Sequence, residues 1–515
     1  MSLLKKELIE EREYQNIIAE KASMKNTLVV LPTGMGKTIV ALLVAVNRLE
    51  KFPESKILIT APTRPLNAQH KKFFEKLTNI SELEISLITG KVLPKMRAKI
   101  YKDSRIVVAT PQTIENDLMN ERIRLDDFSL IVFDEAHRAV KDYAYPLIAK
   151  KYMLQAKNPL ILGLTASPGG SYERIEEINK NLFIEQIEIR TETEKDVEPY
   201  VKTIEKEFIY VDFPEEFKKV QELLKEIKKE DIYWLREHHF LRTYIGSKGE
   251  LLELQNKIAK QYHSGSRNFS LMWAMIRTAS AIKVEHALDL LETQGISFLY
   301  DYLERLKKSK KQTDVRIFKN EKMVGALKII EDLQRKGVDH PKLKKILSIT
   351  KDLLKENSSA KIIIFANYRS TGDRIKKILQ ENEIKSEVLV GQTIKEGKGM
   401  TQQEQIETIR RFGQGEFNTL IGTSISEEGL DIPAVNFAIF YESVPSEIRN
   451  IQRRGRIGRH IIGKVLFLIT KSTRDEAYYW AAFQKEKKMK GILYDLKEKG
   501  IKKKKENLMN FVEKG

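Results

Sequence analysis

The stretch LPTGMGKT at residues 31–38 has the residue types that bind the phosphate groups of a nucleotide. It directly follows an apolar run and precedes a helical segment over residues 39–48. Glycines let backbone amides turn inward around phosphate oxygens, and the N-terminus of the following helix adds partial positive charge. Lys37 would reach the β- and γ-phosphates, and the Thr38 hydroxyl would ligate Mg²⁺. The remaining candidate contacts of this loop are Pro32, Thr33, Gly34, Met35 and Gly36.

The loop departs from the strict phosphate-loop pattern at one position. That pattern has glycine where this chain has Leu31. A purely structural glycine turn is the alternative, but the position between an apolar strand and a helix favours nucleotide binding.

Two carboxylates, Asp134 and Glu135, follow a second apolar run at residues 130–133 and belong to the sequence DEAH. In parallel α/β folds, a carboxylate at the carboxyl end of a strand lies beside the phosphate loop. We expect Asp134 to hold Mg²⁺ and Glu135 to orient and deprotonate the attacking water. His137 is predicted to belong to the same catalytic group. A polar strand end without chemistry is the alternative, and it does not account for the glycine loop upstream.

A third candidate segment, QRRGRIGR at residues 452–459, places arginines at intervals of three. A guanidinium group is always protonated and stabilises the charge that develops on a transferring γ-phosphate. Gln452, Arg456 and Arg459 are therefore predicted to act in catalysis, and contact with nucleic-acid phosphates is the alternative. ATP would have to bridge this segment and the phosphate loop, so we expect ATP binding to close a cleft and hydrolysis to reopen it.

The elements around these motifs form two α/β units. Continuous aliphatic runs separated by helical segments are typical of parallel strands covered by helices on both faces. In the first unit the predicted strands lie at residues 28–31, 57–59, 106–109, 130–133 and 160–162. In the second they lie at residues 362–365, 388–390, 419–421, 437–440 and 465–469.

Between the two units, residues 215–345 lose the strand pattern and are predicted to form an all-α insert. One helix is predicted to pack through Met272, Met275, Ile276, Ala279 and Ile282, which share a helical face. The insert also has aromatic and basic residues that could stack on bases or contact phosphates, although core packing is favoured for the Trp and Phe side chains. These residues are Tyr233, Trp234, Arg236, His238, His239, Phe240 and Arg242.

Composition narrows the class of protein. The chain has 515 residues, a net charge of +18 and no cysteine, which excludes disulfides, cysteine-bound metals and thiol nucleophiles. Residues 201–345 carry a net charge of +7 and residues 485–515 carry +6. This segregation favours a polyanionic partner over a uniformly charged surface tuned for heat or solubility. With neither a long apolar run nor an apolar signal core at its start, we expect a soluble cytoplasmic protein without membrane contact.

The motifs, in their order along the chain, resemble those of superfamily 2 helicases of the DEAH-box kind. The matching positions are Arg12, Tyr14 and Gln15, and the segments 32–38, 61–66, 89–90, 110–113, 134–137, 165–167, 367–369, 422–424, 428–431 and 452–459. The resemblance implies two RecA-like motor domains and a nucleic-acid-stimulated ATPase that uses ATP and Mg²⁺. It implies that Arg12 and Gln15 recognise adenine and that Gly429 and Asp431 contact the nucleotide. It implies nucleic-acid contacts at Thr63, Arg64, Gly90, Thr110, Gln112, Asn367 and Thr423, joined in the insert by Arg236 and Arg242.

Four segments follow from this interpretation. Residues 1–205 would form the first motor domain, with the ATP site and the DEAH box. Residues 206–345 would form the helical insert for duplex or branched DNA, and residues 346–484 the second motor domain with the arginine fingers. Residues 485–515 would form a basic C-terminal tail.

Within the superfamily, the insert and the sequences PQTIENDL and LIVFDEAHRAV are similar to the archaeal Hef and Fanconi-anaemia M-type group. Members of that group act on branched DNA. The resemblance implies a nucleoid-associated DNA helicase or translocase that remodels forks and Holliday junctions in replication-fork repair. RIG-I-like and Dicer helicases have a similar insert, so an RNA-dependent ATPase recognising double-stranded RNA is the alternative. A third alternative is a scaffold with a silent nucleotide site, although the catalytic residue types are all present.

Many archaeal Hef proteins continue into an XPF-type nuclease with an ERK-x-x-x-D site, whereas this sequence reaches Gly515 without one. The resemblance leaves two alternatives, a helicase-only member with a separate nuclease or a shortened chain. A separate nuclease or a sliding clamp is therefore a predicted partner beside nucleic acid.

Overall fold

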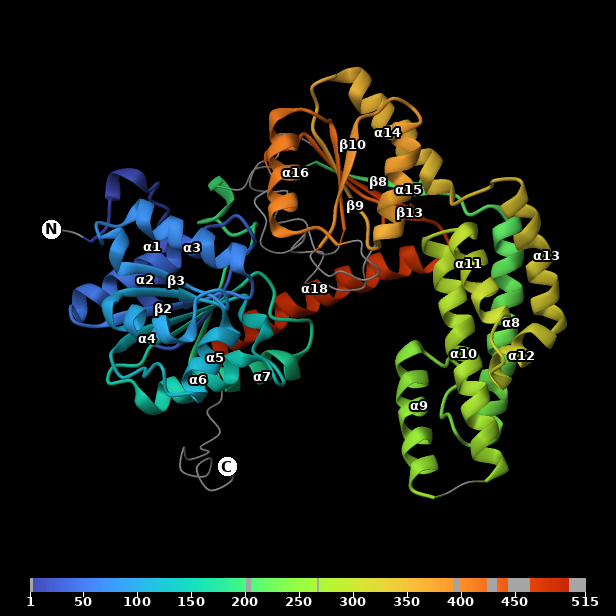
Figure 1. Cartoon of the computed structure of the whole chain (residues 1–515), viewed down its shortest axis with the longest axis horizontal. Coiled ribbons are helices and arrows are strands. Elements are labelled where there is room, and N and C mark those ends of the chain that lie inside the picture. The colour runs from blue at the N-terminus through green and yellow to red at the C-terminus, as the bar shows by residue number, and fades with distance from the viewer. Residues whose placement is uncertain are drawn as a thin grey trace.

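Two parallel sheets and a helical bundle make up the computed structural model of this chain (Figure 1). The structure describes residues 3–200, 205–265, 268–391, 399–423, 433–442 and 464–499. None of the helices in these ranges is both long and apolar enough to cross a membrane. The predicted fold class, two α/β units with an all-α unit between them, is confirmed.

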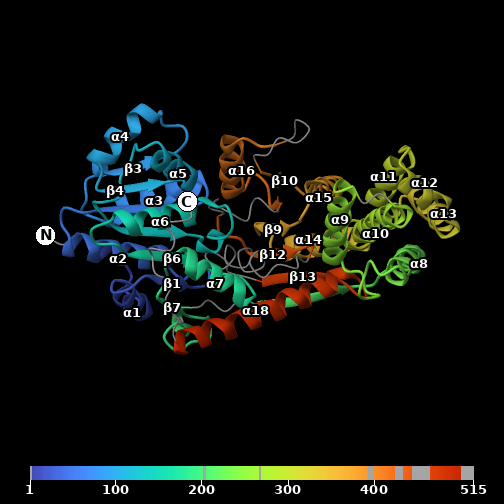
Figure 2. The ribbon, with the colours of Figure 1, turned by 90° about the horizontal axis from the view of Figure 1, so that it is seen from below.

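The first sheet has seven strands in the order β3-β4-β2-β5-β6-β1-β7, and all of its neighbouring strands are parallel. Its strands are β1 (Thr27–Val30), β2 (Lys56–Thr60), β3 (Ile85–Ile88), β4 (Ile106–Ala109), β5 (Phe128–Asp134), β6 (Ile161–Thr165) and β7 (Gln186–Ile189). Every residue of β1, β4, β5 and β6 is buried, because helices cover both faces of the sheet (Figure 2). These helices are α1 (Glu13–Ala22), α2 (Lys37–Lys51), α3 (Arg64–Leu77), α4 (Pro94–Asp103), α5 (Pro111–Met119), α6 (Ala144–Gln155) and α7 (Tyr172–Asn181).

The second sheet has six parallel strands in the order β10-β11-β9-β12-β13-β8. Its strands are β8 (Glu205–Val211), β9 (Ile362–Phe365), β10 (Ser386–Leu389), β11 (Thr419–Gly422), β12 (Phe437–Phe440) and β13 (Lys464–Thr470). The helices α14 (Pro341–Glu356), α15 (Arg369–Gln380) and α16 (Gln402–Gln414) accompany it. All ten strands predicted from the apolar runs are present, whereas β3, β7 and β8 were not predicted because polar residues interrupt them.

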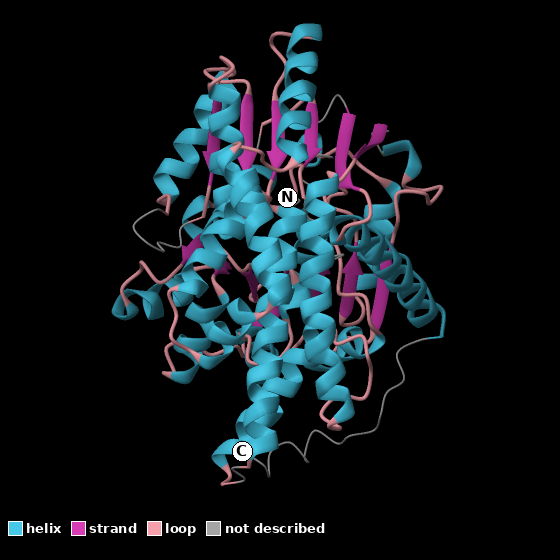
Figure 3. Ribbon diagram, turned by 90° about the vertical axis from the view of Figure 1, so that its right-hand side faces the viewer, coloured by secondary structure: helices cyan, strands magenta, loops and turns pink. Residues whose placement is uncertain are grey.

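The bundle consists of α8 (Glu215–Glu237), α9 (Lys248–His263), α10 (Phe269–Thr293), α11 (Ile296–Lys307), α12 (Gln312–Lys319) and α13 (Glu321–Arg335). From the side of the bundle, its long helices lie in front of the strands (Figure 3). The helix predicted around Met272 exists as α10, and its predicted packing face is confirmed only in part, because Met275 and Ile282 pack partly buried against the bundle core. Met272 is 41% exposed, and the buried face runs instead through Leu271, Ala274, Thr278 and Ala281. Helix α10 packs against both α8 and α9. The small side chains of Ala274, Thr278 and Ala281 on its buried face allow these helices to approach it closely.

The predicted segment boundaries fall inside elements of this structure. Residues 206–211, assigned from sequence to the insert, form most of β8 and pair with β13 at the edge of the second sheet. The boundary at residue 345 lies within α14. The boundary at residue 484 lies within the last described helix, α18 (Arg474–Lys499).

Helix α18 contacts all three units, and in Figure 2 it runs along the lower side of the ribbon from the bundle to the first sheet. At its start, the Arg474 guanidinium lies 3.0 Å from Glu285 of α10. Near its other end, Met489 and Leu493 are buried in the core of the first unit. Residues 485–499 are thus a packed helix, and only residues 500–515 of the predicted tail lie outside the described residues.

Candidate functional site

Three predicted motifs meet at the carboxyl edge of the first sheet. Strand β6 lies between β5 and β1, with Asp134 opposite Leu164 and Val30 opposite Thr165. The Leu31 amide donates to the Thr165 carbonyl oxygen over 3.2 Å. Because parallel strands end at a common edge, the phosphate loop, the DEAH residues and Thr165 surround one site.

The loop between β1 and α2 has the backbone shape of a phosphate cradle. Gly34 and Gly36 have left-handed φ angles of 91° and 77°, and the Lys37 ammonium donates to the Leu31 carbonyl oxygen over 3.0 Å. A Cβ atom on Gly36 would lie only 2.2 Å from Nε2 of Gln15, so a side chain at this position would clash with Gln15. Pro32, Thr33 and Met35 lie in the same turn, and Thr38 is the second residue of α2. This set of donors fits the phosphates of a nucleotide.

The predicted adenine side of the site lies in α1. The Tyr14 hydroxyl and the Gln15 side-chain amide both donate to the Met35 carbonyl oxygen, over 2.8 and 3.3 Å. The Arg12 guanidinium lies 5.0 Å from the ring centroid of Tyr200, which in turn lies 5.7 Å from the Tyr14 ring. Tyr200 was not predicted, because no motif surrounds it and only the folded chain brings it to α1.

Asp134 ends β5 with its carboxylate held on two sides. Its Oδ1 accepts the Glu135 amide over 2.9 Å, and its Oδ2 lies 2.8 Å from Nε2 of His70. The buried Tyr145 hydroxyl donates to the Asp134 carbonyl oxygen over 2.6 Å, and burial holds the pKa of Tyr145 well above its ordinary value. His70 was not predicted, although a histidine seven residues after Thr63 in a motif helix was visible in the sequence.

Magnesium fits this arrangement of residues. Among the described residues, no group of three or more His, Cys, Asp or Glu side chains could hold a metal ion. Mg²⁺ is commonly bound through one or two carboxylates together with substrate phosphates. Asp134 and the Thr38 hydroxyl would hold the ion here, and when bound it would neutralise charge on the β- and γ-phosphates.

Glu135 and His137, the two predicted catalytic residues that follow Asp134, lie beside it at the end of β5. Glu135 has a left-handed φ of 53°, which turns the chain sharply out of β5. The Nδ1 atom of buried His137 lies 3.2 Å from Glu135 Oε2 and 3.2 Å from the Thr165 hydroxyl. The Ser167 hydroxyl, two residues further on, contacts the Met489 sulfur of α18 at 3.0 Å. The DEAH segment is therefore connected through residues 165–167 to a helix that also contacts the other two units.

The predicted nucleic-acid residues of the first unit follow β2, β3 and β4 at the same edge. Thr63 caps α3, and the exposed Arg64 guanidinium lies 3.7 Å from the position of a Cβ atom on Gly90. Thr110 precedes α5, and its hydroxyl pairs with that of Thr113 at 2.7 Å. Gln112 is exposed one residue into α5. These residues therefore lie at the same edge of the first sheet as the phosphate loop.

In the second unit, Asn367 and Thr423 follow the adjacent strands β9 and β11. The Asn367 amide donates to Glu442 Oε2 over 2.6 Å, and the Thr423 hydroxyl donates to the Leu389 carbonyl oxygen over 3.4 Å. Because β9 and β11 are parallel neighbours, both residues lie at the carboxyl edge of the second sheet. Gly429, Asp431, Gln452, Arg456 and Arg459 lie outside the described residues.

Buried Glu442 makes the stability of the second unit depend on pH. Burial raises the pKa of Glu442 to about 7 from 4.5, although the Asn367 amide opposes this shift. Between pH 4.5 and 7 the folded chain therefore binds more protons here than the unfolded chain, so stability falls as pH rises. We expect Glu442→Gln to remove this fall and to gain thermal stability relative to wild type between pH 5 and pH 8.

The gain would be at most about 3 kcal/mol, measured from unfolding curves at the two pH values. Glu381→Gln, at an exposed carboxylate after α15, is the matched control and should follow wild type. Equal pH dependence in wild type and Glu442→Gln would show that Glu442 is ionised throughout this range.

The predicted nucleic-acid residues of the bundle, Arg236 and Arg242, lie around the C-terminal end of α8. They are far from the phosphate loop. The Arg236 guanidinium lies 5.1 Å from the Tyr244 ring centroid, and Tyr233 and Tyr244 are each 58% exposed with their rings 6.3 Å apart. Arg242 is exposed in the loop after α8. Trp234 and Phe240 instead pack against the bundle core, as the alternative for these side chains predicted.

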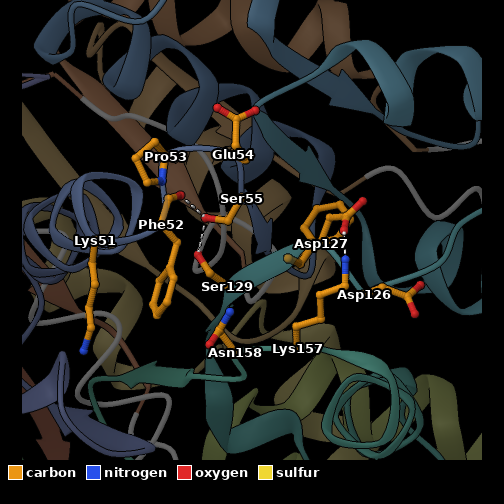
Figure 4. Close-up of a pocket in the computed structure, with 11 residues that line it drawn as sticks. Lys51, Phe52, Pro53, Glu54, Ser55, Asp126, Asp127, Ser129, Lys157 and Asn158 are labelled. Carbon is orange, nitrogen blue, oxygen red and sulfur yellow. Dashed lines mark hydrogen bonds and ion pairs between the residues drawn. The ribbon is translucent and has the colours of Figure 1, made fainter.

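A cavity of about 290 Å³, whose lining residues are drawn in Figure 4, lies at the amino ends of β2 and β5, at the edge of the first sheet opposite the phosphate loop. Its lining includes Ser55 and Ser129, whose hydroxyls are 2.7 Å apart near the amino ends of β2 and β5. Parallel sheets bind ligands at their carboxyl ends, so this cavity is not the nucleotide site.

Family models match three parts of the chain. Residues 12–175 match the DEAD/DEAH box helicase model, and residues 341–461 match the helicase conserved C-terminal domain. Residues 216–337 match a helical bundle described for a putative ATP-dependent RNA helicase.

Relatives extend the similarity to almost the whole chain. A putative ATP-dependent RNA helicase of Methanocaldococcus jannaschii is 44% identical over 96% of this chain and 62% of its own length. An ATP-dependent DNA helicase of Schizosaccharomyces pombe is 33% identical over 90% of this chain and 57% of its own length. This chain thus spans roughly three fifths of the length of these two relatives.

A solved structure identifies the family to which this chain belongs. The crystal structure of the Pyrococcus furiosus Hef helicase domain is 44% identical to this chain, with a TM-score of 0.74. The match covers 93% of this chain and 99% of that domain. The ATP and Mg²⁺ expected from the motifs are the usual cofactors of ATP-dependent helicases of this kind. This chain therefore belongs to the superfamily 2 DEAD/DEAH-box helicases, and within them to the Hef and Fanconi-anaemia M-type group.

Proposed function

We propose that this chain is an ATP-driven DNA helicase or translocase that remodels forked and four-way DNA. The likeness to the Hef helicase domain, which extends through the bundle as well as both sheets, is the observation that carries this proposal. The DNA helicase named in Schizosaccharomyces pombe supports the same substrate. In this proposal residues 1–205 bind and hydrolyse ATP, the bundle holds duplex near the branch, and the second sheet unit supplies arginines.

The exposed end of the bundle supports a role in binding nucleic acid. Tyr233 and Tyr244 present aromatic faces to solvent, and Arg236 and Arg242 place positive charge beside them. Aromatic faces stack on unpaired bases, and guanidinium groups contact phosphates. Such a surface suits a branch, where duplex backbone and unpaired bases lie close together.

Duplex RNA is the second candidate substrate. The relative from Methanocaldococcus jannaschii and the model matching the bundle are both named for RNA helicases. RNA selectivity requires contacts to 2′-hydroxyls and to A-form geometry. The ATPase rate of wild type should therefore be measured with four-way DNA, blunt duplex DNA and duplex RNA of matched length. We expect four-way DNA to stimulate most, and stronger stimulation by duplex RNA would overturn the proposed substrate.

The bundle contacts can be tested through the salt dependence of DNA binding. Each phosphate contact contributes about 0.9 to the slope of log affinity against log salt. We expect the double variant Arg236→Ala, Arg242→Ala to lower that slope by up to about 1.8. The control is Arg335→Ala, Lys336→Ala at the exposed end of α13, which removes the same charge from the same bundle. An equal effect of both double variants would exclude a specific contact at the end of α8.

A further inference from the structure

His70 makes its contact inside the nucleotide site from a helix that the motifs assign to nucleic acid. It lies on α3 and is only 4% exposed, with Nε2 2.8 Å from Oδ2 of Asp134. Within the part of the chain that the structure describes, its buried Nδ1 has no hydrogen-bond partner. Burying a polar atom without a partner costs about 1–3 kcal/mol. The contact with Asp134 is therefore the one hydrogen bond that the ring makes to the described residues.

Helix α3 is held firmly to the loop in which its nucleic-acid contacts are predicted. Asn67 is fully buried, and its side chain accepts the Ala61 amide over 3.2 Å and donates to the carbonyl oxygens of Ala61 and Thr63 over 2.7 and 2.8 Å. Thr63 caps the helix, and Phe74 and Leu77 anchor its far end in the core. Since a helix rises 1.5 Å per residue, residues 63 and 70 are about 10 Å apart on one rigid element.

The two contacts of the Asp134 carboxylate differ in origin. Oδ1 accepts the amide of the adjacent residue, Glu135, and so moves with the end of β5. Oδ2 instead contacts a different element through His70. Each carboxylate oxygen has a second lone pair that remains available for a metal ion. A shift of α3 would therefore rotate the Asp134 carboxylate about the hydrogen bond that its Oδ1 accepts from the Glu135 amide. This rotation would change the direction of the lone pairs that bind Mg²⁺.

We propose that His70 is a positioning residue that couples nucleic-acid contact at the start of α3 to the Mg²⁺-binding carboxylate of Asp134. Nucleic acid bound at Thr63 and Arg64 fixes α3, and His70 then holds the carboxylate in the geometry that the Mg²⁺–ATP complex needs. This inference rests on the proposed function for the existence of a nucleic-acid contact at α3, whatever the nucleic acid.

Three variants distinguish loss of the proposed coupling between α3 and Asp134 from loss of side-chain packing around residue 70. His70→Leu keeps the apolar bulk and removes the donor, whereas His70→Gln keeps an N–H donor of similar reach. Gln69→Ala changes an exposed neighbour on the same helix and is the matched control. Thermal unfolding curves of the full chain are measured for each variant, so that loss of fold is distinguished from loss of coupling.

The first readout is the ratio of ATPase rates with and without saturating nucleic acid. Coupling energies between sites are commonly worth about 5- to 150-fold. We expect His70→Leu to lower the stimulation ratio at least about five-fold, and His70→Gln and Gln69→Ala to stay near wild type. If His70→Leu lowers both rates by the same factor, or if His70→Gln is as impaired as His70→Leu, the proposal is overturned.

The second readout does not depend on turnover. Mg²⁺ is titrated into the protein with a fluorescent, non-hydrolysable ATP analogue, with and without nucleic acid. Nucleic acid should lower the Mg²⁺ concentration at half-saturation in wild type and Gln69→Ala, and should leave it unchanged in His70→Leu. An equal shift in wild type and His70→Leu would contradict coupling through His70. The nucleic acid used is whichever one stimulates wild type most, so a preference for RNA would overturn the proposed substrate without deciding the role of His70.

Discussion

Glu135→Gln is expected to lower kcat for ATP hydrolysis by at least about 10²-fold while leaving ATP bound, because a general base contributes about 10²- to 10⁴-fold. Glutamine has nearly the same size, so it keeps the contact with His137 Nδ1, which lies 3.2 Å from Oε2. It cannot take a proton from the attacking water. With ATP bound and chemistry blocked, the two sheet units should remain in the closed state.

Single-turnover hydrolysis and binding of a fluorescent ATP analogue measure the two halves of this prediction. The control is Glu176→Gln on α7, an exposed carboxylate of the same unit. Turnover within a few-fold of wild type in Glu135→Gln would remove Glu135 from the role of base. Loss of nucleotide binding together with turnover would instead assign it to binding.

Lys37→Ala is expected to abolish measurable ATPase activity, with a loss on the order of 10²- to 10³-fold or more, because it removes a cation at the developing γ-phosphate charge. The Lys37 ammonium already lies at the loop, where it donates to the Leu31 carbonyl oxygen over 3.0 Å. DNA binding should largely persist, since the exposed aromatic and basic residues of the bundle are remote from the loop. ATPase rates and DNA affinity at fixed salt test both parts.

Lys51→Ala, at the exposed opposite end of α2, is the control for charge and helix position. It should retain wild-type turnover and DNA affinity. If Lys37→Ala lost DNA binding as completely as turnover, the nucleotide and nucleic-acid sites would have to be one.

Most of the fold could be predicted because its strands are buried on both faces. Runs such as 106–109 and 362–365 are continuous and aliphatic, and each forms a strand over those residues. The strands that were not predicted have mixed patterns. Strand β8, with the sequence EKEFIYV, is mostly exposed at the sheet edge and is held there by pairing with β13, which lies about 260 positions further along the chain. Local pattern contains no information about such a distant partner.

The helices show the same limit. The 3.6-residue period correctly predicted α10, but Met272 proved exposed because the packing partners α8 and α9 decide which stripe is buried. In α18 the apolar spacing of Met489 and Leu493 was present in a lysine-rich segment, and net charge concealed it. Lys485, Lys487 and Lys488 are exposed on this packed helix, whereas Lys497 contacts the Ile189 carbonyl oxygen of the first unit over 3.3 Å.

The sequence by itself determined the chemistry of this protein. Phosphate binding, Mg²⁺ binding and water activation need particular side chains at short spacings beside strand ends, and the stretch 31–38, Asp134 and Glu135 have these residue types and positions. Only the tertiary structure decided which other elements bring side chains into contact with these residues. His70 reaches Asp134 from another helix, and Tyr200 reaches Tyr14 across the sheet unit. Such contacts depend on the order of strands and the packing of helices, which arise from burial of the whole chain and not from any local run of residues.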